Sequence, residues 1–217
     1  MVKTPTFFDI VGRIPASDLT RAATGWLVEE IDGEKMPTYM RWLADGVDRS
    51  RFALTFVCLS DGAAALADEL SARGWTALAW QMNRYKINPF TDAQVIWRLF
   101  KLIRREKFDL VHAHGSKGGF IARIAAIGSG VPVVYSPHNF SFHEGVPRWQ
   151  ATIFAFVEKL AARFLTAKIM TVSNGEQTMA RQFGVGKPEL FTTVHSGVDL
   201  AAFEIEMREG AIAVFIA

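Results

Sequence analysis

The feature that most constrains this sequence is a regular alternation between short β-branched or aromatic runs and longer stretches of helical periodicity. The alternation begins near Trp26 and continues to about residue 203. Such a pattern is typical of parallel strands joined by crossover helices. Several short runs are continuously apolar, as strands covered on both faces must be. We therefore expect an α/β fold, a Rossmann-like doubly wound parallel sheet of about seven strands.

The pattern also predicts where the strands and helices lie. Two segments, 26–30 and 7–11, compete for the first strand, because Glu29 and Glu30 are unfavourable in a buried strand. The predicted strands are 26–30, 52–58, 75–80, 110–114, 131–136, 168–172 and 191–194. The predicted helices are 39–47, 63–73, 92–107, 117–128, 149–164 and 175–183.

Domain boundaries follow from where the alternation begins and ends. Residues 1–24 are interpreted as an N-terminal extension and residues 25–203 as one Rossmann-like domain. Residues 204–217 are interpreted as a linker and the start of a second domain. No internal repeat or low-complexity segment interrupts the main domain.

Composition and charge exclude several classes of protein. The residues are 50% apolar and 21% charged, which is the balance of a folded globular chain. Twenty-four basic against 22 acidic residues leave a net charge of +2, so no broad positive field for a nucleic-acid partner exists. Cys58 is the single cysteine, and neither a signal peptide nor a membrane-spanning run is visible. We expect a cytoplasmic protein.

Polar residues gather directly after the apolar runs, where parallel sheets bind their ligands. The candidate site consists of a glycine-rich segment after the fourth predicted strand and polar residues after the first, fifth and sixth. These residues are Gly33, His114, Gly115, Ser116, Lys117, Gly118, His138, Asn139 and Ser173.

Two histidines in the fourth predicted strand carry most of this interpretation. Strand alternation places His112 and His114 on one face, with His114 at the tip, where solvent and ligand can reach it. His112 lies deeper and is interpreted as a hydrogen-bonded core histidine. A metal site formed by the pair is disfavoured because no Cys, Asp or Glu stands nearby at ligand spacing.

The glycine-rich segment after His114 suits an anionic ligand. Glycines let the backbone approach a ligand closely, and the helix predicted to begin near Ser116 offers unpaired amides and a partial positive charge. Lys117 would add a full positive charge. The alternative is that these glycines only form a tight turn between a strand and a helix. No phosphate-binding P-loop or G-x-G-x-x-G dinucleotide motif occurs elsewhere.

The predicted helix at 92–107 is basic and amphipathic. It carries Arg98, Lys101 and Arg105 beside an apolar stripe. Such a helix can lie on anionic lipid. The structural alternative, that the stripe covers the sheet while the basic side faces water, is favoured.

Four motifs, in order along the chain, resemble those of family 4 glycosyltransferases of the GT-B fold, especially enzymes that assemble bacterial surface polysaccharides. They are FDLVHAHGSKGG at 108–119, PVVYSPHNFSF at 132–142, KIMTVSNGE at 168–176 and VHSGVD at 194–199. The resemblance implies that this chain is the N-terminal, acceptor-side half of such an enzyme.

The resemblance also implies a reaction and roles for individual residues. The reaction is transfer of a sugar from a nucleotide diphosphate sugar, as co-substrate, with retention at the anomeric carbon and with no metal ion or other cofactor. His114 matches a catalytic histidine that faces the donor sugar, and Gly33 matches a glycine near the diphosphate. The paired glycines usual at the latter place are absent, because residues 32–37 read DGEKMP.

We expect the family's C-terminal half, which holds the sugar nucleotide, to have no counterpart in these 217 residues. Residues 211–217 resemble its first strand, and the paired glutamates of that half are not found. A partner chain that supplies the donor half is one explanation, and a truncated gene is another. The expected partners are therefore a saccharide or lipid-linked acceptor, a donor-domain chain and a membrane surface.

Two other functions stay open at this stage. One is a non-catalytic acceptor-binding or membrane-docking module left from a split or truncated transferase. The other is an unrelated small-molecule binder, since a Rossmann-like sheet alone does not determine function.

Overall fold

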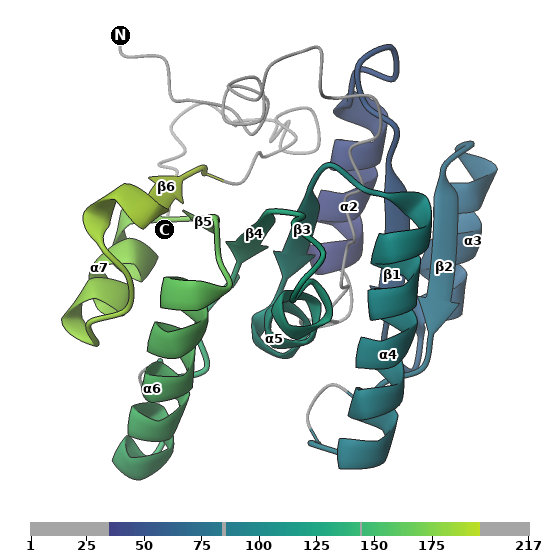
Figure 1. Cartoon of the computed structure of the whole chain (residues 1–217). Helices are drawn as coiled ribbons and strands as arrows, with labels where there is room; N and C mark the ends of the chain where they lie inside the picture. The colour runs from purple at the N-terminus through teal and green to yellow at the C-terminus, as the bar shows by residue number, and fades with distance from the viewer. Residues whose placement is uncertain (1–34, 84–85, 144, 196–217) are drawn as a thin grey trace, which may run out of the picture.

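The computed structural model describes residues 35–83, 86–143 and 145–195 (Figure 1). Several sequence predictions fall outside these ranges: the first strand at 26–30, its competitor at 7–11, Gly33, and the segments 1–24 and 204–217. The described part contains two parallel sheets flanked by helices.

The described strands form a two-stranded and a four-stranded sheet. The first contains β1 (Thr55–Leu59) and β2 (Thr76–Trp80), paired in parallel. The second has the order β3-β4-β5-β6 and is parallel throughout. Its strands are β3 (Val111–His114), β4 (Val133–Ser136), β5 (Lys168–Thr171) and β6 (Phe191–Thr193). Six of the seven predicted strands are thereby confirmed.

Each of the six predicted helices is also present. α4 shows why the boundaries fall where they do: the Asn88 side chain accepts hydrogen bonds from the first amides, and Lys107 ends the helix in a left-handed conformation. The helices are α2 (Lys35–Gly46), α3 (Ala63–Ala72), α4 (Pro89–Glu106), α5 (Ser116–Ala125), α6 (Arg148–Phe164) and α7 (Asn174–Gln182).

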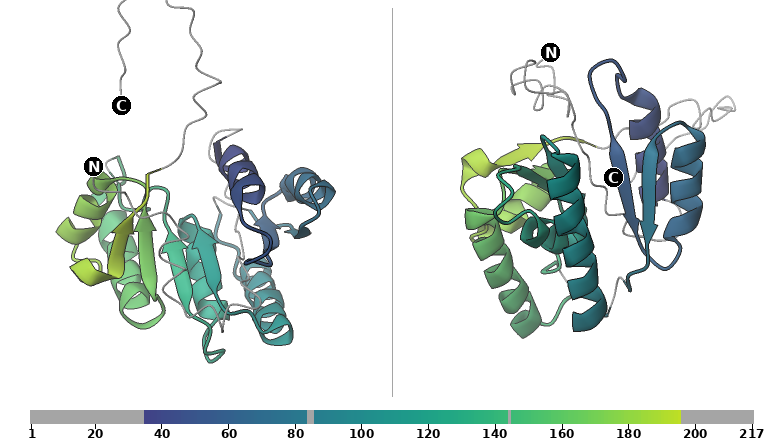
Figure 2. Two further views of the ribbon diagram at one scale, coloured as in Figure 1. Left: turned by 90° about the horizontal axis from the view of Figure 1, so that it is seen from above. Right: turned by 45° about the vertical axis from the view of Figure 1, so that its right-hand side comes forward.

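Side-chain alternation along β1 divides the core between the two faces. Phe56 and Cys58 pack against α2 and α3, whereas Val57 and Leu59 pack against α4 and α5. Val134 of β4 and Met170 of β5 belong to the first of these clusters, so the same core extends under both sheets. Helices therefore cover both faces (Figure 2), and the predicted doubly wound α/β fold is confirmed.

A third cluster lies under α6. Tyr135 of β4 and its register partner Ile169 of β5 point to one face and pack against alanines of α6. α5 covers the neighbouring part of that face, where Gly119 closely approaches Tyr135. Helices α4, α5 and α6 thus form one layer over the sheets (Figure 1).

Candidate functional site

Two hydrogen-bonded histidines lie at the carboxyl end of β3. His114 is the last residue of β3, and His138 lies in the loop that follows β4. His114 Nδ1 and His138 Nε2 are 2.7 Å apart in a hydrogen bond, one nitrogen donating to the other, and the rings stack with centroids 5.0 Å apart. Left-handed backbone at His138 (φ 49°) and Asn139 (φ 92°) turns the loop toward β3. Two residues 24 positions apart in sequence therefore form one imidazole pair.

His112 lies behind this pair. Its Nε2 is 2.8 Å from Ser136 Oγ, and its ring centroid is 4.1 Å from that of His114. The side chain is fully buried. The interpretation of His112 as a hydrogen-bonded core histidine is confirmed.

The prediction that solvent can reach His114 was wrong. The strand ends where expected, but the His114 side chain has an exposed fraction of 0%. Strand alternation placed the residue correctly, and it could not show that the loop after β4 folds back over the strand tip. His138, which that loop carries, is half-buried and is the member of the pair that meets solvent.

Burial makes the three imidazoles weak bases. It lowers the pKa of His112 to about 3 and the pKa of His138 to about 4. The pKa of His114 lies well below its ordinary value, first because of burial and then because His112 and His138 stand beside it. At neutral pH the cluster is uncharged, and it offers hydrogen-bonding nitrogens rather than a cation.

The glycine-rich segment forms the turn from β3 into α5. Gly115 has a left-handed φ of 71° and precedes the helix without a side-chain cap, while its amide donates to Ser136 O at 2.9 Å. Ser116, the first helical residue, donates to the carbonyl of Asn139 at 3.4 Å. Gly118 is buried within the first turn. The helix start therefore lies beside the histidine pair, as the sequence predicted.

Lys117 makes contacts within the chain. Its Nζ lies 2.7 Å from Asp92 Oδ1 and donates to the carbonyls of Asn83 and Lys86 at 2.7 and 2.9 Å. These contacts tie α5 to the start of α4. Its predicted contact with an anionic ligand stays a prediction.

Glu176, a residue that sequence reasoning left out of the site, holds the His138 loop. Its Oε1 accepts from the Asn139 amide at 2.6 Å and its Oε2 from the Val172 amide at 2.9 Å. Ser173 caps α7 by accepting from the Glu176 amide at 3.1 Å. Ser173-x-x-Glu176 is the capping-box spacing, the signal that could have drawn attention to this glutamate.

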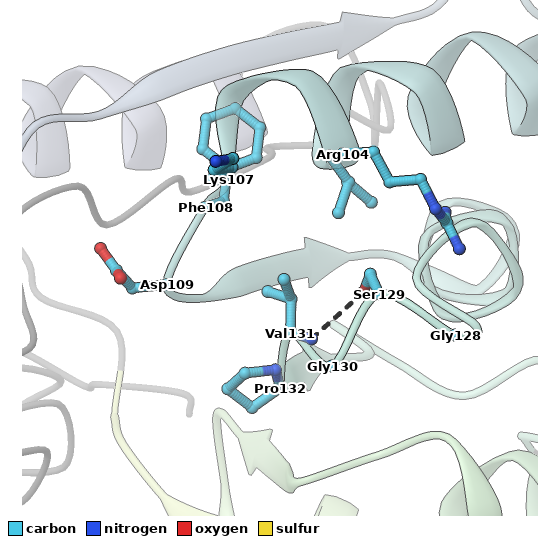
Figure 3. A pocket seen from close by; sticks show the side chains of 10 residues that line it. Arg104, Lys107, Phe108, Asp109, Gly128, Ser129, Gly130, Val131 and Pro132 are labelled. Carbon is cyan, nitrogen blue, oxygen red and sulfur yellow. Dashed lines mark hydrogen bonds between the residues drawn. The ribbon is translucent and has the colours of Figure 1, made fainter.

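The described residues contain no group of three or more His, Cys, Asp or Glu side chains able to hold a metal ion. A separate pocket of about 440 Å³ lies away from the histidines (Figure 3). It is lined by residues just before β3 and β4, including Phe108, Asp109 and Pro132, at the amino ends of these strands. Within it, Ser129 Oγ accepts from the Val131 amide at 3.1 Å. Parallel sheets bind ligands at the opposite edge, where His114 and His138 lie.

Comparison with known families gives a match over most of the chain. The model of the glycosyl transferase 4-like domain matches residues 36–197 of the 217 residues. This range includes the histidine pair, the glycine-rich turn and Glu176.

Individual relatives match just over half of the chain. A galactosyltransferase of Escherichia coli, named for UDP-Gal and α-D-GlcNAc-diphosphoundecaprenol, is 31% identical over 125 residues, 57% of this chain and 32% of that protein. The Bacillus subtilis putative glycosyltransferase EpsD is 30% identical over 128 residues, 55% of this chain and 33% of that protein. The chain thus matches about a third of the length of these relatives.

A solved structure shows the same fold. Anabaena HepE, crystallised in complex with UDP, superposes with a TM-score of 0.61 at 16% identity, covering 83% of this chain and 45% of that one. No helix among residues 35–83, 86–143 and 145–195 has the length and apolar character needed to cross a membrane.

Proposed function

Because the chain belongs to the glycosyl transferase 4-like family, we propose that it is the acceptor-binding half of a retaining glycosyltransferase that uses a nucleotide diphosphate sugar. The acceptor is a saccharide or a lipid-linked saccharide, a choice supported by the diphosphoundecaprenol in the name of the E. coli relative. A single observation carries the proposal: the uncharged His114–His138 pair at the carboxyl edge of a parallel sheet.

An uncharged imidazole pair suits a sugar better than a phosphate. A cation would favour the diphosphate, whereas burial keeps these rings neutral and able to hydrogen bond to hydroxyl groups. In the proposal the pair acts as one unit: half-buried His138 faces the acceptor sugar, and His114 holds the His138 ring through the 2.7 Å hydrogen bond. Catalysis then rests on orienting the sugar and stabilising developing charge.

The neighbouring residues take supporting roles in this proposal. Gly115, Ser116 and Gly118 present the first amides of α5 to the ligand, as the start of a helix does for anions. Asn139 and Ser173 are both hydrogen-bonded to Glu176, and in this way they help to fix the loop that carries His138. Lys117 and Gly33 are assigned to the diphosphate side on the family resemblance.

The sugar nucleotide requires further protein in this proposal. The relatives are about three times as long as the region matched here, and their remaining parts are the place for a donor-binding half. That half belongs to a further domain or to a partner chain. We assign no metal ion and no cofactor to the reaction, and peripheral contact with a membrane follows if the acceptor is lipid-linked.

The proposal is tested by binding of a water-soluble short-chain polyprenyl diphosphate N-acetylglucosamine to the purified chain. We expect saturable binding that His138→Ala weakens about tenfold or more, the loss expected for a hydrogen-bonding group at a polar ligand. His143→Ala, a change at an exposed histidine, is the matched control. Absence of binding would contradict the acceptor-binding role.

A transfer assay with UDP-galactose tests whether donor binding requires a second half of the enzyme. The chain alone is expected to show little or no sugar transfer. Robust turnover would refute the assignment of donor binding to another half. A non-catalytic acceptor-binding or membrane-docking module is the second candidate function, favoured if binding is found but transfer stays absent when the donor half is supplied.

A further inference from the structure

Helix α6 buries small side chains against the sheet and exposes large apolar ones, whereas α4 buries valine, leucine and isoleucine side chains. The buried side of α6 consists of Ala151, Ala155, Ala161 and Ala162, with Glu158 paired to Arg123. Its large apolar side chains point away from the sheet. Trp149 is 65% exposed and Phe164 is 69% exposed.

Six of the seven exposed large apolar side chains of α6 form one continuous stripe, and Phe154 lies to one side of it. At 3.6 residues per turn the six fall within an arc of roughly 100° opposite the alanines, along a helix about 25 Å long. We call this set the α6 stripe. It consists of Trp149, Ile153, Phe156, Val157, Leu160 and Phe164.

The stripe belongs to a wider apolar face. Among the described residues, the exposed large hydrophobic side chains lie on α4, α5 or α6 or within two residues of these helices. Trp42 is the one exception. These helices form one layer over the sheets (Figure 1). On the other face, Trp42 is the one exposed large hydrophobic residue among the described side chains of α2 and α3. Such one-sided exposure is typical of an interaction surface rather than of scattered surface residues.

Charge indicates what covers the stripe. The one acidic residue of α6, Glu158, is buried against Arg123. Arg148, Lys159 and Arg163 are exposed along one border of the stripe. An apolar stripe with aromatic residues and a purely basic border is the pattern of helices that lie in the headgroup region of anionic bilayers.

We infer that the α6 stripe docks the protein on an anionic lipid surface, with α6 lying parallel to it. The inference rests on the proposed function, because a lipid-linked acceptor would hold its diphosphate at that surface. The loop after His138 leads directly into α6, so docking would bring the histidine pair close to the headgroups. The sequence named the helix at 92–107 as a lipid-binding candidate but favoured the alternative in which its apolar stripe covers the sheet, and that alternative is confirmed. The apolar residues Val95, Leu99, Leu102 and Ile103 of that helix are buried against the sheet.

Co-sedimentation with vesicles tests the α6 stripe. The vesicles contain equal parts of phosphatidylglycerol and phosphatidylcholine, and the test variant is Trp149→Gln with Phe156→Gln. Both side chains are more than half exposed, so the variant should fold, as circular dichroism will check. We expect about tenfold weaker binding or more, since each aromatic contributes through buried apolar area.

The matched control is Trp42→Gln on α2, whose exposed side chain lies outside the layer formed by α4, α5 and α6. It should bind vesicles like the unaltered chain. Lys159→Gln with Arg163→Gln should lose about fivefold or more, and only on anionic vesicles.

Several outcomes would overturn the inference. One is an α6 variant that binds vesicles as well as the unaltered chain, and another is a loss of the same size in the Trp42→Gln variant. A third is a dimer of the unaltered chain, seen by light scattering, that the α6 variant converts to monomer while vesicle binding is absent. Binding of the soluble acceptor analogue is measured separately. Loss of vesicle binding with acceptor binding intact would contradict only the docking inference, and the reverse result would contradict only the proposed function.

Discussion

Glu176 in α7 accepts a hydrogen bond from the backbone amide of Asn139, 37 residues earlier, at 2.6 Å. The second oxygen of the same carboxylate accepts from the Val172 amide. One buried side chain therefore joins the loop that carries His138 to the loop between β5 and α7. Burial raises the pKa of Glu176, while the two amide hydrogen bonds act in the opposite direction.

Glu176→Ala is expected to destabilise the protein by about 2–4 kcal/mol, because it leaves two amides without their acceptor. Urea unfolding measures the change in the free energy of unfolding. Glu189→Ala, at an exposed side chain, should stay within about 0.5 kcal/mol of the unaltered chain. Equal stability of the two variants would show that Glu176 does not hold the loop.

Sequence reasoning predicted the fold well because its signals were local. Six strands and six helices appear where hydrophobic periodicity placed them, and the carboxyl edge of the sheet was correctly expected to gather His114, His138 and the glycine-rich turn. Burial of His114 was missed, because it depends on left-handed backbone at His138 and Asn139. Nothing local in the sequence demands that conformation at these two residues.

Contacts between distant residues were missed for the same reason. Glu176 was visible only as a possible helix cap, although its second role is to hold a loop 37 positions away. Lys117 was interpreted as a ligand-binding charge, and only the structure shows that Asp92 lies 2.7 Å from it. Side-chain pairing across a fold requires knowledge of which helix faces which.

Gly119→Ala is expected to be strongly destabilising. A Cβ at this position would lie 2.2 Å from Cε2 of the fully buried Tyr135 ring, so the ring or α5 must move. Overpacking of this kind costs about 1–3 kcal/mol or more. The thermal midpoint should fall, measured by circular dichroism.

Two further variants distinguish a steric clash from a general effect on the helix. Gly62→Ala adds a methyl group where nothing lies within 4 Å and should change stability little. Adding Tyr135→Leu to Gly119→Ala should recover part of the loss, since the ring that clashes is gone. If the losses in the free energy of unfolding of the two single variants simply added up in the double variant, the clash would not be the cause.

Arg123 and Glu158 form a buried two-pronged ion pair between α5 and α6. The guanidinium Nη1 and Nη2 lie 2.5 and 2.9 Å from the two carboxylate oxygens, and its Nε donates to Gly119 O at 2.9 Å. Arg123→Met should cost about 3–5 kcal/mol, because Glu158 is left as an unpaired buried charge. The double change Arg123→Met with Glu158→Leu should cost clearly less. Arg105→Met, at an exposed pair with Glu106, is the control and should change the free energy of unfolding by less than about 1 kcal/mol.

The histidine cluster predicts that stability falls in mild acid. The folded pKa values of His112 and His138, about 3 and about 4, lie below the ordinary value near 6.5, and that of His114 is lowered as well. Above about pH 6.5 the imidazoles are neutral in the folded and unfolded chains, and their contribution is constant. As the pH falls below 6.5, the unfolded chain binds protons that the folded chain does not, so the free energy of unfolding decreases.

Each such histidine removes about 1.4 kcal/mol per pH unit between its unfolded and folded pKa values, and His138 somewhat less because it is half-buried. Urea unfolding between about pH 7 and pH 5 measures this slope. His138→Gln should make the slope shallower, because one titrating group with a lowered pKa is lost. A slope that does not change with His138→Gln would mean that the half-buried ring is protonated as easily in the folded chain as in the unfolded one. The neutral imidazole on which the proposed sugar contact depends would then exist only above the ordinary histidine pKa.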